Sequence, residues 1–329
     1  MTYKVFVTRD IPDEGIKMLK KDKRVKLDVY EHDKKIPRSV LKRRVKGMDI
    51  ILSILTEKMD AEIMDAAGPG LKMIANYAVG FNNVDLEAAK KRGIVVSNTP
   101  GEEISEAVAE HTIALMFALS KRLVEVDEFT RAGKYHGWGP KMFLGTDLWG
   151  KTVGIIGSGR IGSGVVHRLH DGFNMNVLYN DLRRNPKLEK ETGARYRSLA
   201  QLLKQSDFVS LHVPLLPSTR HLISTKELKL MKKTAFLINT ARGPVIDEKA
   251  LVKALLKGEI AGAGLDVFEC EPLIDCDPND NLELRKLKNV VLTPHTASAT
   301  LGARQAMSRT AAENILAFIK GKTPPNMVK

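Results

Sequence analysis

Cysteines and long apolar runs are scarce in this chain of 329 residues. Its two cysteines, Cys270 and Cys276, do not have C-x-x-C spacing, and no histidine pair stands at the spacing of a zinc site. We therefore expect no bound metal and a reducing compartment, the cytoplasm. No apolar run approaches the roughly 20 residues of a membrane span. The N-terminus enters a strand-like segment without the pattern of a signal peptide.

Acidic residues are fewer than basic ones, which gives a net charge of +13. The lysines and arginines are nevertheless scattered among acids, and the chain lacks an arginine-rich tail and aromatic–basic interleaving. We therefore expect neither a nucleic-acid nor a membrane partner. A basic, solvated surface would instead attract small anionic substrates.

The remaining composition is that of an ordinary globular protein, with 43% hydrophobic and 28% charged residues. The length is large for a single core and favours two domains. In the first hundred residues, short strand-like segments alternate with helical ones, which predicts a parallel sheet covered on both faces. The predicted strands are 4–8, 25–30, 50–54, 73–76 and 95–97, and the predicted helices are 14–20, 38–46, 61–67 and 86–92.

A long helix follows, around residues 104–119, and His111 stands on its apolar face. We expect this histidine to be packed and hydrogen-bonded rather than catalytic. A last helix at 301–320 comes too late for the second sheet and is expected to return to the first domain, so that one domain is inserted into the other. The intervening strands are predicted at 176–180, 208–212, 235–239, 262–266 and 290–293.

A glycine motif in the middle of the chain predicts a dinucleotide site. Gly157, Gly159 and Gly162 form G-x-G-x-x-G between an apolar strand and a helix that begins near Arg160. The first glycine permits a tight turn, the second lets a pyrophosphate approach the backbone, and the third lets the helix pack on the strand. The free N–H groups of the helix N-terminus would face the phosphates.

Asp181 ends the following strand, close to the roughly 20-residue spacing expected for an acid that binds the adenosine ribose. A carboxylate repels a 2′-phosphate, so this acid favours NAD over NADP. Arg183 and Arg184 follow at once and could instead hold a phosphate. NAD is therefore the expected cofactor, and NADP stays open.

Three polar segments follow strands of the second sheet, on the side where open parallel sheets bind ligands. They are residues 239–243, 264–272 and 293–298, and each brings a charged or titratable group to that edge. With the glycine motif and residues 76–85, they resemble the D-isomer-specific 2-hydroxyacid dehydrogenases over essentially the whole chain. Through residues 137–140 and 324–326, the chain is most similar to the glyoxylate and hydroxypyruvate reductases of that family.

The resemblance implies a catalytic group of three residues. Arg242 would bind the substrate carboxylate and polarise the 2-oxo group with its fork of N–H donors. His295 would give a proton to the carbonyl oxygen as hydride arrives. Glu271 would hydrogen-bond His295, fix its orientation and favour its protonated form.

The same resemblance implies the contacts with cofactor and substrate. The implied assembly is a homodimer, built through a segment at about 120–150, in which Trp138 reaches into the pocket of the partner subunit. The implied cofactor contacts are Gly157, Gly159, Arg160, Ile161, Gly162, Asp181, Arg183, Val213, Pro214, Thr219, Thr240, Ala241, Arg242, Asp266, His295 and Ala297. The implied substrate contacts are Leu55, Val79, Gly80, Trp138 and Arg242.

The resemblance also implies the fold class, which is α/β with two doubly wound parallel-sheet domains. A flavodoxin-like substrate domain (1–99 and 296–329) would receive a Rossmann dinucleotide-binding domain (100–295) as an insertion. The chain departs from the family pattern at Thr296-Ala297, where Ile-Gly is usual, at Asn174, where glycine is common, and in the polar stretch 101–104. We expect these departures to affect efficiency more than reaction class.

The predicted function is hydride transfer between NAD(P)H and a small 2-oxo acid such as glyoxylate or hydroxypyruvate. Two alternatives remain open. A phosphoglycerate dehydrogenase would suit the basic surface. A dinucleotide-sensing scaffold, similar to the corepressors that share this fold, could keep the same three residues.

Overall fold

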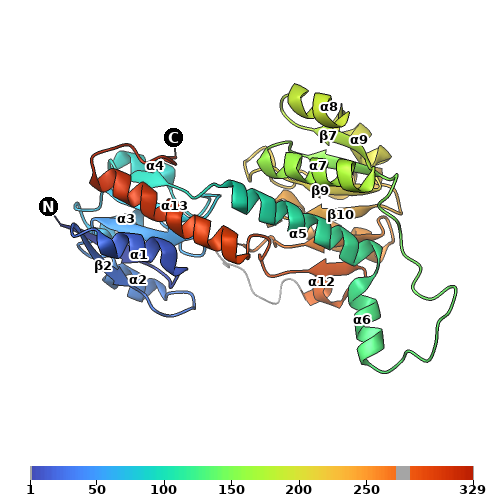
Figure 1. The fold of residues 1–329 in the computed structure, drawn as a ribbon, viewed down its shortest axis with the longest axis horizontal. Helices are drawn as coiled ribbons and strands as arrows, with labels where there is room; N and C mark the ends of the chain where they lie inside the picture. Colours follow the sequence, from blue (N-terminus) through green and yellow to red (C-terminus); the bar gives the residue numbers. More distant parts are fainter. Residues whose placement is uncertain (1, 272–281, 329) are drawn as a thin grey trace. The chain divides into compact units, whose positions relative to one another are not determined.

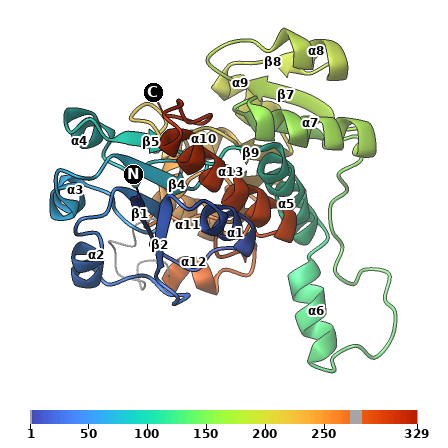
Figure 2. The ribbon, with the colours of Figure 1, turned by 60° about the vertical axis from the view of Figure 1, so that its left-hand side comes forward.

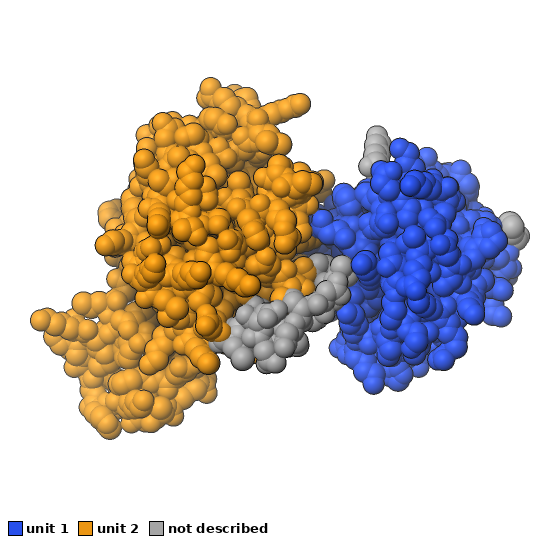
Figure 3. Space-filling model, turned by 180° about the vertical axis from the view of Figure 1, so that it is seen from behind, with its two compact units in different colours: residues 1–104, 272–274, 299–329 blue, residues 105–271, 275–298 orange. Residues whose placement is uncertain are grey.

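The computed structural model describes residues 2–271 and 282–328, so Cys276 lies outside the described part of the chain. The chain divides into two compact units, which Figure 3 shows in different colours. Unit 1 runs to Ile104 and resumes at Ala299, whereas unit 2 runs from Ser105 to Glu271 and ends at Ser298. Unit 2 is therefore an insertion within unit 1.

Unit 1 contains a parallel sheet of five strands in the order β2-β1-β3-β4-β5. Alternate residues of its central strands, Phe6, Ile51 and Ile74, pack against helices α2, α3 and α4 on one face. Helices α1 and α13 lie on the other face (Figure 2). The elements are β1 (Tyr3–Val7), α1 (Asp13–Lys21), β2 (Val25–Val29), α2 (Arg38–Arg44), β3 (Ile50–Ile54), α3 (Ala61–Ala67), β4 (Met73–Tyr77), α4 (Leu86–Lys91), β5 (Val95–Ser97) and α13 (Leu301–Ile319).

The last helix completes the core of the first unit. Helix α13 lies beside α1 (Figure 1). Gly15 permits this close approach, because a Cβ at that position would lie 2.0 Å from the carbonyl oxygen of Ser308. The Ser308 hydroxyl also accepts a hydrogen bond from the Gly15 N–H at 3.0 Å. The two ends of the sequence are thus joined by packing and by a buried hydrogen bond.

Unit 2 contains a parallel sheet of seven strands in the order β12-β11-β10-β9-β6-β7-β8. Helices α5, α7 and α8 pack on one face, and α9, α10 and α11 pack on the other. The elements are α5 (Glu102–Ser120, which starts in unit 1), α6 (Leu123–Arg131), β6 (Thr152–Ile156), α7 (Arg160–Phe173), β7 (Asn176–Asn180), α8 (Pro186–Thr192), β8 (Arg195–Tyr196), α9 (Leu199–Gln205), β9 (Phe208–Leu211), α10 (Thr225–Leu230), β10 (Phe236–Asn239), a 3-10 turn (Gly243–Val245), α11 (Glu248–Leu256), β11 (Gly262–Leu265), α12 (Leu282–Lys286) and β12 (Val290–Leu292).

The two strand orders confirm the predicted fold class. Unit 1 has the 2-1-3-4-5 order of flavodoxin-like sheets, and unit 2 has the 3-2-1-4-5-6 order of Rossmann sheets with β12 added at the edge. Ligands of such sheets bind beyond the carboxyl ends of the strands, where the strand order reverses. The reversal lies between β1 and β3 in unit 1 and between β6 and β9 in unit 2. Within the described residues, every helix is too short or too polar to cross a bilayer.

Two departures from the family pattern have local structural explanations. Asn174 caps the C-terminus of α7 in the left-handed region, with φ of 50°. Asparagine tolerates this conformation better than other residues with a side chain, so the helix ends as it would with glycine. In the polar stretch 101–104, Glu103 lies in the first turn of α5 and forms an ion pair of 3.2 Å with Arg309 on α13.

Helix α6 and the chain that follows it stand away from the sheet of their own unit (Figures 1 and 2). None of the residues of α6 is buried. Beyond the helix, Trp138, Leu144 and Trp149 are 82%, 68% and 73% exposed. Phe129 and Phe143 stack edge to face and give the segment a small core of its own. This projection carries an unusual amount of exposed apolar surface.

Candidate active site

The glycine loop between β6 and α7 has the geometry of a phosphate site. Gly157 has a φ of 95°, and a Cβ there would lie 2.7 Å from the carbonyl oxygen of His212. A Cβ on Gly162 would lie 2.0 Å from the carbonyl oxygen of Gly157. Gly159, by contrast, faces open space. A phosphate can therefore approach the backbone at Gly159, beside the N-terminus of α7.

Asp181 closes this loop from the end of β7. Its Oδ2 accepts hydrogen bonds from the N–H and the hydroxyl of Ser158, at 2.7 and 2.8 Å. Arg184 is paired with Glu189 at 2.6 Å, and Arg183 is exposed. A carboxylate therefore faces the glycine loop, while one of the two following arginines is engaged elsewhere.

These features fit the dinucleotide that the sequence predicts. The pyrophosphate would lie against Gly159 and the first N–H groups of α7, at Arg160 and Ile161, because these groups have no carbonyl partner within the helix. The adenosine ribose would lie beside Asp181. When bound in its reduced form, the nicotinamide of such a cofactor supplies a hydride.

The loops after β9 and β10 carry further residues of the predicted cofactor set. Val213 and Pro214 follow β9, and the hydroxyl of Thr219 donates to the carbonyl oxygen of Pro214 at 2.6 Å. Thr240 and Ala241 follow β10. The Thr240 side chain is buried and bonded at 2.9 Å to a threonine hydroxyl of α5. Both loops are thus braced by side-chain hydroxyls.

Arg242 stands at the end of the β10 loop, with its backbone held by Asn239. The Asn239 amide donates to the carbonyl oxygen of Arg242 and accepts the N–H of Ala241. The guanidinium makes one hydrogen bond to the described residues, from Nη1 to the carbonyl oxygen of Ala241 at 2.6 Å. Burial lowers the pKa of Arg242, and the nearby Glu271 opposes that shift. The other N–H groups of the fork are available to a carboxylate ligand.

His295 and Glu271 form a close pair at the same edge of the sheet. His295 Nδ1 lies 2.6 Å from Glu271 Oε2, and the two side chains are 26% and 20% exposed. Because a carboxylate accepts at Nδ1, the proton on that nitrogen is fixed and Nε2 is left for a substrate. The charge of Glu271 also acts on the pKa of Arg242, so the three predicted catalytic residues belong to one electrostatic group in unit 2.

Asp266 holds the turn that presents His295. Its side chain is fully buried, and Oδ1 accepts the Thr296 N–H at 2.8 Å while Oδ2 accepts the Ala297 N–H at 2.9 Å. His295 itself has a φ of 54°, in the left-handed region. At the Thr-Ala departure, both backbone N–H groups are therefore hydrogen-bonded. Asp266 and Ala297, which were predicted as cofactor contacts, also bind each other.

In unit 1, Val79 and Gly80 follow β4, and their carbonyl oxygens are tied back by side chains. Asn98 Nδ2 donates to the Val79 oxygen at 2.7 Å, and Asn76 Nδ2 donates to the Gly80 oxygen at 3.0 Å. Within the described residues, neither the Val79 nor the Gly80 N–H has a partner. Backbone N–H groups without a partner are able to bind an anion.

A buried polar network links this loop to the loop of Leu55, which follows β3. Asn83 Nδ2 donates to the carbonyl oxygens of Ile54 and Glu57, at 3.1 and 3.0 Å, and its amide pairs reciprocally with that of Asn76. Glu57 is buried, and this burial raises the pKa of its carboxyl. These hydrogen bonds thus fix the two predicted substrate loops relative to each other.

Three structural residues of these sites were not predicted. Ser158 stands within the glycine motif, and Asn83 stands within the segment that carries the family resemblance. Their positions in these motifs could have identified them, but the sequence did not indicate their hydrogen-bond partners. His212 follows β9 at the strand-order reversal, where burial lowers its pKa to about 3 and its Nε2 lies 2.9 Å from the Ser210 hydroxyl. Its ring is therefore neutral at physiological pH.

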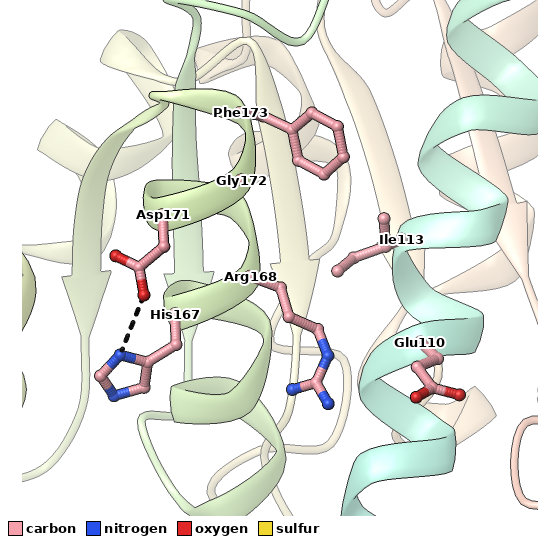
Figure 4. Close-up of a pocket in the computed structure, with 7 residues that line it drawn as sticks. All are labelled: Glu110, Ile113, His167, Arg168, Asp171, Gly172 and Phe173. Atoms are coloured by element: carbon pink, nitrogen blue, oxygen red, sulfur yellow. Dashed lines mark ion pairs between the residues drawn. The ribbon is translucent and has the colours of Figure 1, made fainter.

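The predicted site residues are divided between the two units. Leu55, Val79 and Gly80 belong to unit 1 and the three catalytic candidates belong to unit 2, while the side chain of Trp138 is almost fully solvent-exposed. A cavity of about 530 Å³ lies between α5 and α7 (Figure 4), and none of the predicted site residues lines it. Over residues 2–271 and 282–328, no cluster of histidine, cysteine and acidic residues has the arrangement of a metal site.

Comparison with known sequences shows which proteins the chain is similar to. Residues 113–297 match the family model described as D-isomer specific 2-hydroxyacid dehydrogenase, NAD binding domain. The chain is 49% identical to the glyoxylate reductase of Thermococcus kodakarensis, over 100% of this chain and 96% of that protein. The match therefore includes both units.

Solved structures agree with the sequence comparison. The TT0316 protein of Thermus thermophilus superposes with a TM-score of 0.90 at 41% identity, covering 99% of this chain and 100% of that one. The D-lactate dehydrogenase of Aquifex aeolicus, solved with NAD and lactic acid, gives a TM-score of 0.85 at 34% identity, covering 99% and 98%. The chain carries an NAD-binding domain and belongs to the D-isomer specific 2-hydroxyacid dehydrogenase family.

Proposed function

We propose that this protein is an NADH-dependent reductase of small 2-oxo acids, with glyoxylate or hydroxypyruvate as substrate. The observation that carries the proposal is the group formed by Arg242, Glu271 and His295, with Nδ1 of the histidine 2.6 Å from the acid. The name of the Thermococcus relative, which matches over 96% of its length, supports glyoxylate in particular. The supply of reduced nicotinamide in the cytoplasm favours that compartment.

In the proposed reaction, Arg242 binds the substrate carboxylate with its N–H fork and polarises the 2-oxo group. Hydride adds to C2 of the substrate, and His295 Nε2 donates a proton to the carbonyl oxygen, which gives the 2-hydroxy acid. Glu271 keeps the ring in the orientation that leaves Nε2 free. The N–H groups of Val79 and Gly80 are proposed as a second carboxylate anchor, with Leu55 contacting the rest of the substrate.

The direct test is a panel of 2-oxo acids assayed by the absorbance of the reduced nicotinamide, with NADH and with NADPH. We expect the highest kcat/KM with glyoxylate or hydroxypyruvate and NADH. 3-Phosphoglycerate with NAD serves as the test for the related dehydrogenase of that substrate. The absence of turnover with every 2-oxo acid would exclude the proposed activity.

The preference for NADH is proposed from Asp181, whose carboxylate faces the glycine loop. Asp181→Asn keeps an acceptor oxygen for Ser158 and removes the charge, so kcat/KM with NADPH is expected to rise relative to that with NADH by on the order of 10-fold. Adding Arg183→Ala should reduce the NADPH gain, because Arg183 is the exposed cation at this position. An unchanged cofactor ratio in Asp181→Asn would show that the preference lies elsewhere.

We propose a homodimer formed through residues of about 120–150. The support is the exposed apolar surface of this projection, where Trp138 is 82% exposed and α6 lacks any buried residue. Such surface is stabilised when a second subunit covers it. Sedimentation velocity of the full chain measures the assembly, and a monomer at micromolar concentration would contradict the proposal.

A further inference from the structure

His111 on α5 makes contacts that the proposed reaction does not yet use. Its Nε2 lies 3.0 Å from Thr293 Oγ1 and 3.5 Å from Asp266 Oδ1, and its side chain is 22% exposed. Asp266 accepts hydrogen bonds from the backbone of the turn that carries His295, and Thr293 donates a hydrogen bond to Asp266. A residue on the helix outside the sheet thus reaches the support of the catalytic candidate.

The direction of the hydrogen bonds in this group can be assigned. The Thr293 hydroxyl donates to Asp266 Oδ1 at 2.6 Å, and a hydroxyl has a single hydrogen to donate. Thr293 Oγ1 is therefore the acceptor toward His111, so His111 Nε2 carries a hydrogen. This chain of donors runs from His111 through Thr293 to Asp266.

Asp266 depends on these donors because it is fully buried. Burial alone would raise the pKa of its carboxyl, but hydrogen bonds from His111, Thr293 and the Thr296 and Ala297 amides hold that pKa below its usual value. The carboxylate is therefore kept ionised in the interior. An ionised carboxylate accepts the two amide hydrogen bonds that shape the turn more strongly than a neutral acid does.

We propose that His111 is a positioning residue for the reduction, acting through Thr293 and Asp266 to hold the 293–297 turn that presents His295. His295 has a φ of 54°, in the left-handed region, which is costly for a residue with a side chain. The turn therefore needs surrounding hydrogen bonds to hold this conformation. This role rests on the proposed function, since it concerns the placement of the proton donor. It does not require His111 to touch substrate or cofactor.

The test compares variants that remove and that retain the hydrogen bond. His111→Phe and Thr293→Val are expected to lower kcat by on the order of 10- to 100-fold, because a shift of about 1 Å in a reacting group has an effect of that size. His111→Gln and Thr293→Ser retain a donor and a hydroxyl, and kcat is expected within about threefold of the parent. The KM for the 2-oxo acid should change little, since Arg242 is untouched.

His111 and Thr293 act through the same series of hydrogen bonds. The double variant His111→Phe/Thr293→Val should therefore lose no more activity than either single variant. Multiplicative losses would overturn the proposal, and so would kcat values for His111→Phe and Thr293→Val within twofold of the parent. An equal loss of kcat in His111→Gln and His111→Phe would also overturn the proposal. If His111→Phe fails to fold, His111→Leu replaces it in the comparison with His111→Gln.

A second measurement separates this proposal from the proposed function. Hydrogen exchange of the Thr296 and Ala297 amides reports the turn directly and needs no turnover. Exchange is expected to be faster in His111→Phe and Thr293→Val than in the parent, and near the parent rate in His111→Gln. Unchanged exchange would contradict the positioning role, whereas a parent protein without activity on any 2-oxo acid would contradict only the proposed function.

Discussion

Arg242→Ala is expected to lower kcat/KM for the 2-oxo acid by on the order of 30- to 5000-fold. The loss corresponds to about 2–5 kcal/mol, the usual cost of truncating one partner of a buried, hydrogen-bonded charge pair. Arg242 is suited to such a pair, because its backbone is fixed by Asn239 and its guanidinium makes a single hydrogen bond to the described residues. Most of the fork is thus preorganised for a ligand. Steady-state kinetics over a range of substrate concentrations measures both kcat and KM.

Arg242→Lys is the matched control, because it keeps the positive charge and removes the planar fork. We expect Lys to recover part of the loss in KM and little of the loss in kcat, since one ammonium cannot bind the carboxylate in two places and polarise the 2-oxo group. The Kd for NADH, measured by fluorescence titration without substrate, should change far less than kcat/KM in both variants, because Arg242 is only one of many implied cofactor contacts. If Arg242→Ala had the same turnover as the parent, Arg242 would not be part of the substrate site.

Most strands of both sheets could be predicted from the sequence because they are short segments rich in apolar residues. Residues 50–54 and 95–97 match β3 and β5, and the other predicted strands of the two sheets agree with the structure within one residue at each end. The central strands are covered by helices on both faces, so burial acts on nearly all of their side chains and leaves a strong pattern. The family, too, was identified correctly from its motifs, because they follow strand ends at fixed positions.

The short elements of unit 2 could not be predicted in the same way. Strand β8 has two residues, Arg195–Tyr196, which is too short for any periodicity. Helix α9 has seven residues and is begun by a capping box between Ser198 and Gln201, a signal that the sequence contained. Elements of this length are stabilised by the sheet they cover rather than by their own propensity.

The partners of the site residues were the least predictable part. The approach of Asn83 to Ile54 and Glu57, and of His111 to Thr293, depends on packing between segments far apart in the sequence. Asp266 was assigned to the cofactor by resemblance, and the structure adds that its oxygens hold the 293–297 turn. A motif can identify a residue type at a strand end, but it does not state which neighbour accepts its hydrogen bonds.

His295→Ala is expected to lower kcat for 2-oxo acid reduction by on the order of 10²- to 10⁴-fold, the usual contribution of a positioned general acid. The variant leaves the Arg242 fork intact, so the KM for the substrate should change much less than kcat. Glu271→Gln is the matched variant for the second residue of the pair. It retains an oxygen that accepts from His295 Nδ1 but removes the charge, so its loss should fall between those of the parent and His295→Ala.

Added imidazole provides the decisive control for His295, because His295→Ala leaves space for a free ring and keeps Glu271 as its acceptor. Partial recovery of kcat that saturates with imidazole would show that proton donation, and not folding, was lost. The same addition should leave Arg242→Ala unchanged, since that variant still has its proton donor. A His295→Ala enzyme that retains kcat within threefold of the parent would show that water supplies the proton, and the histidine–acid pair of 2.6 Å would then have a structural role only.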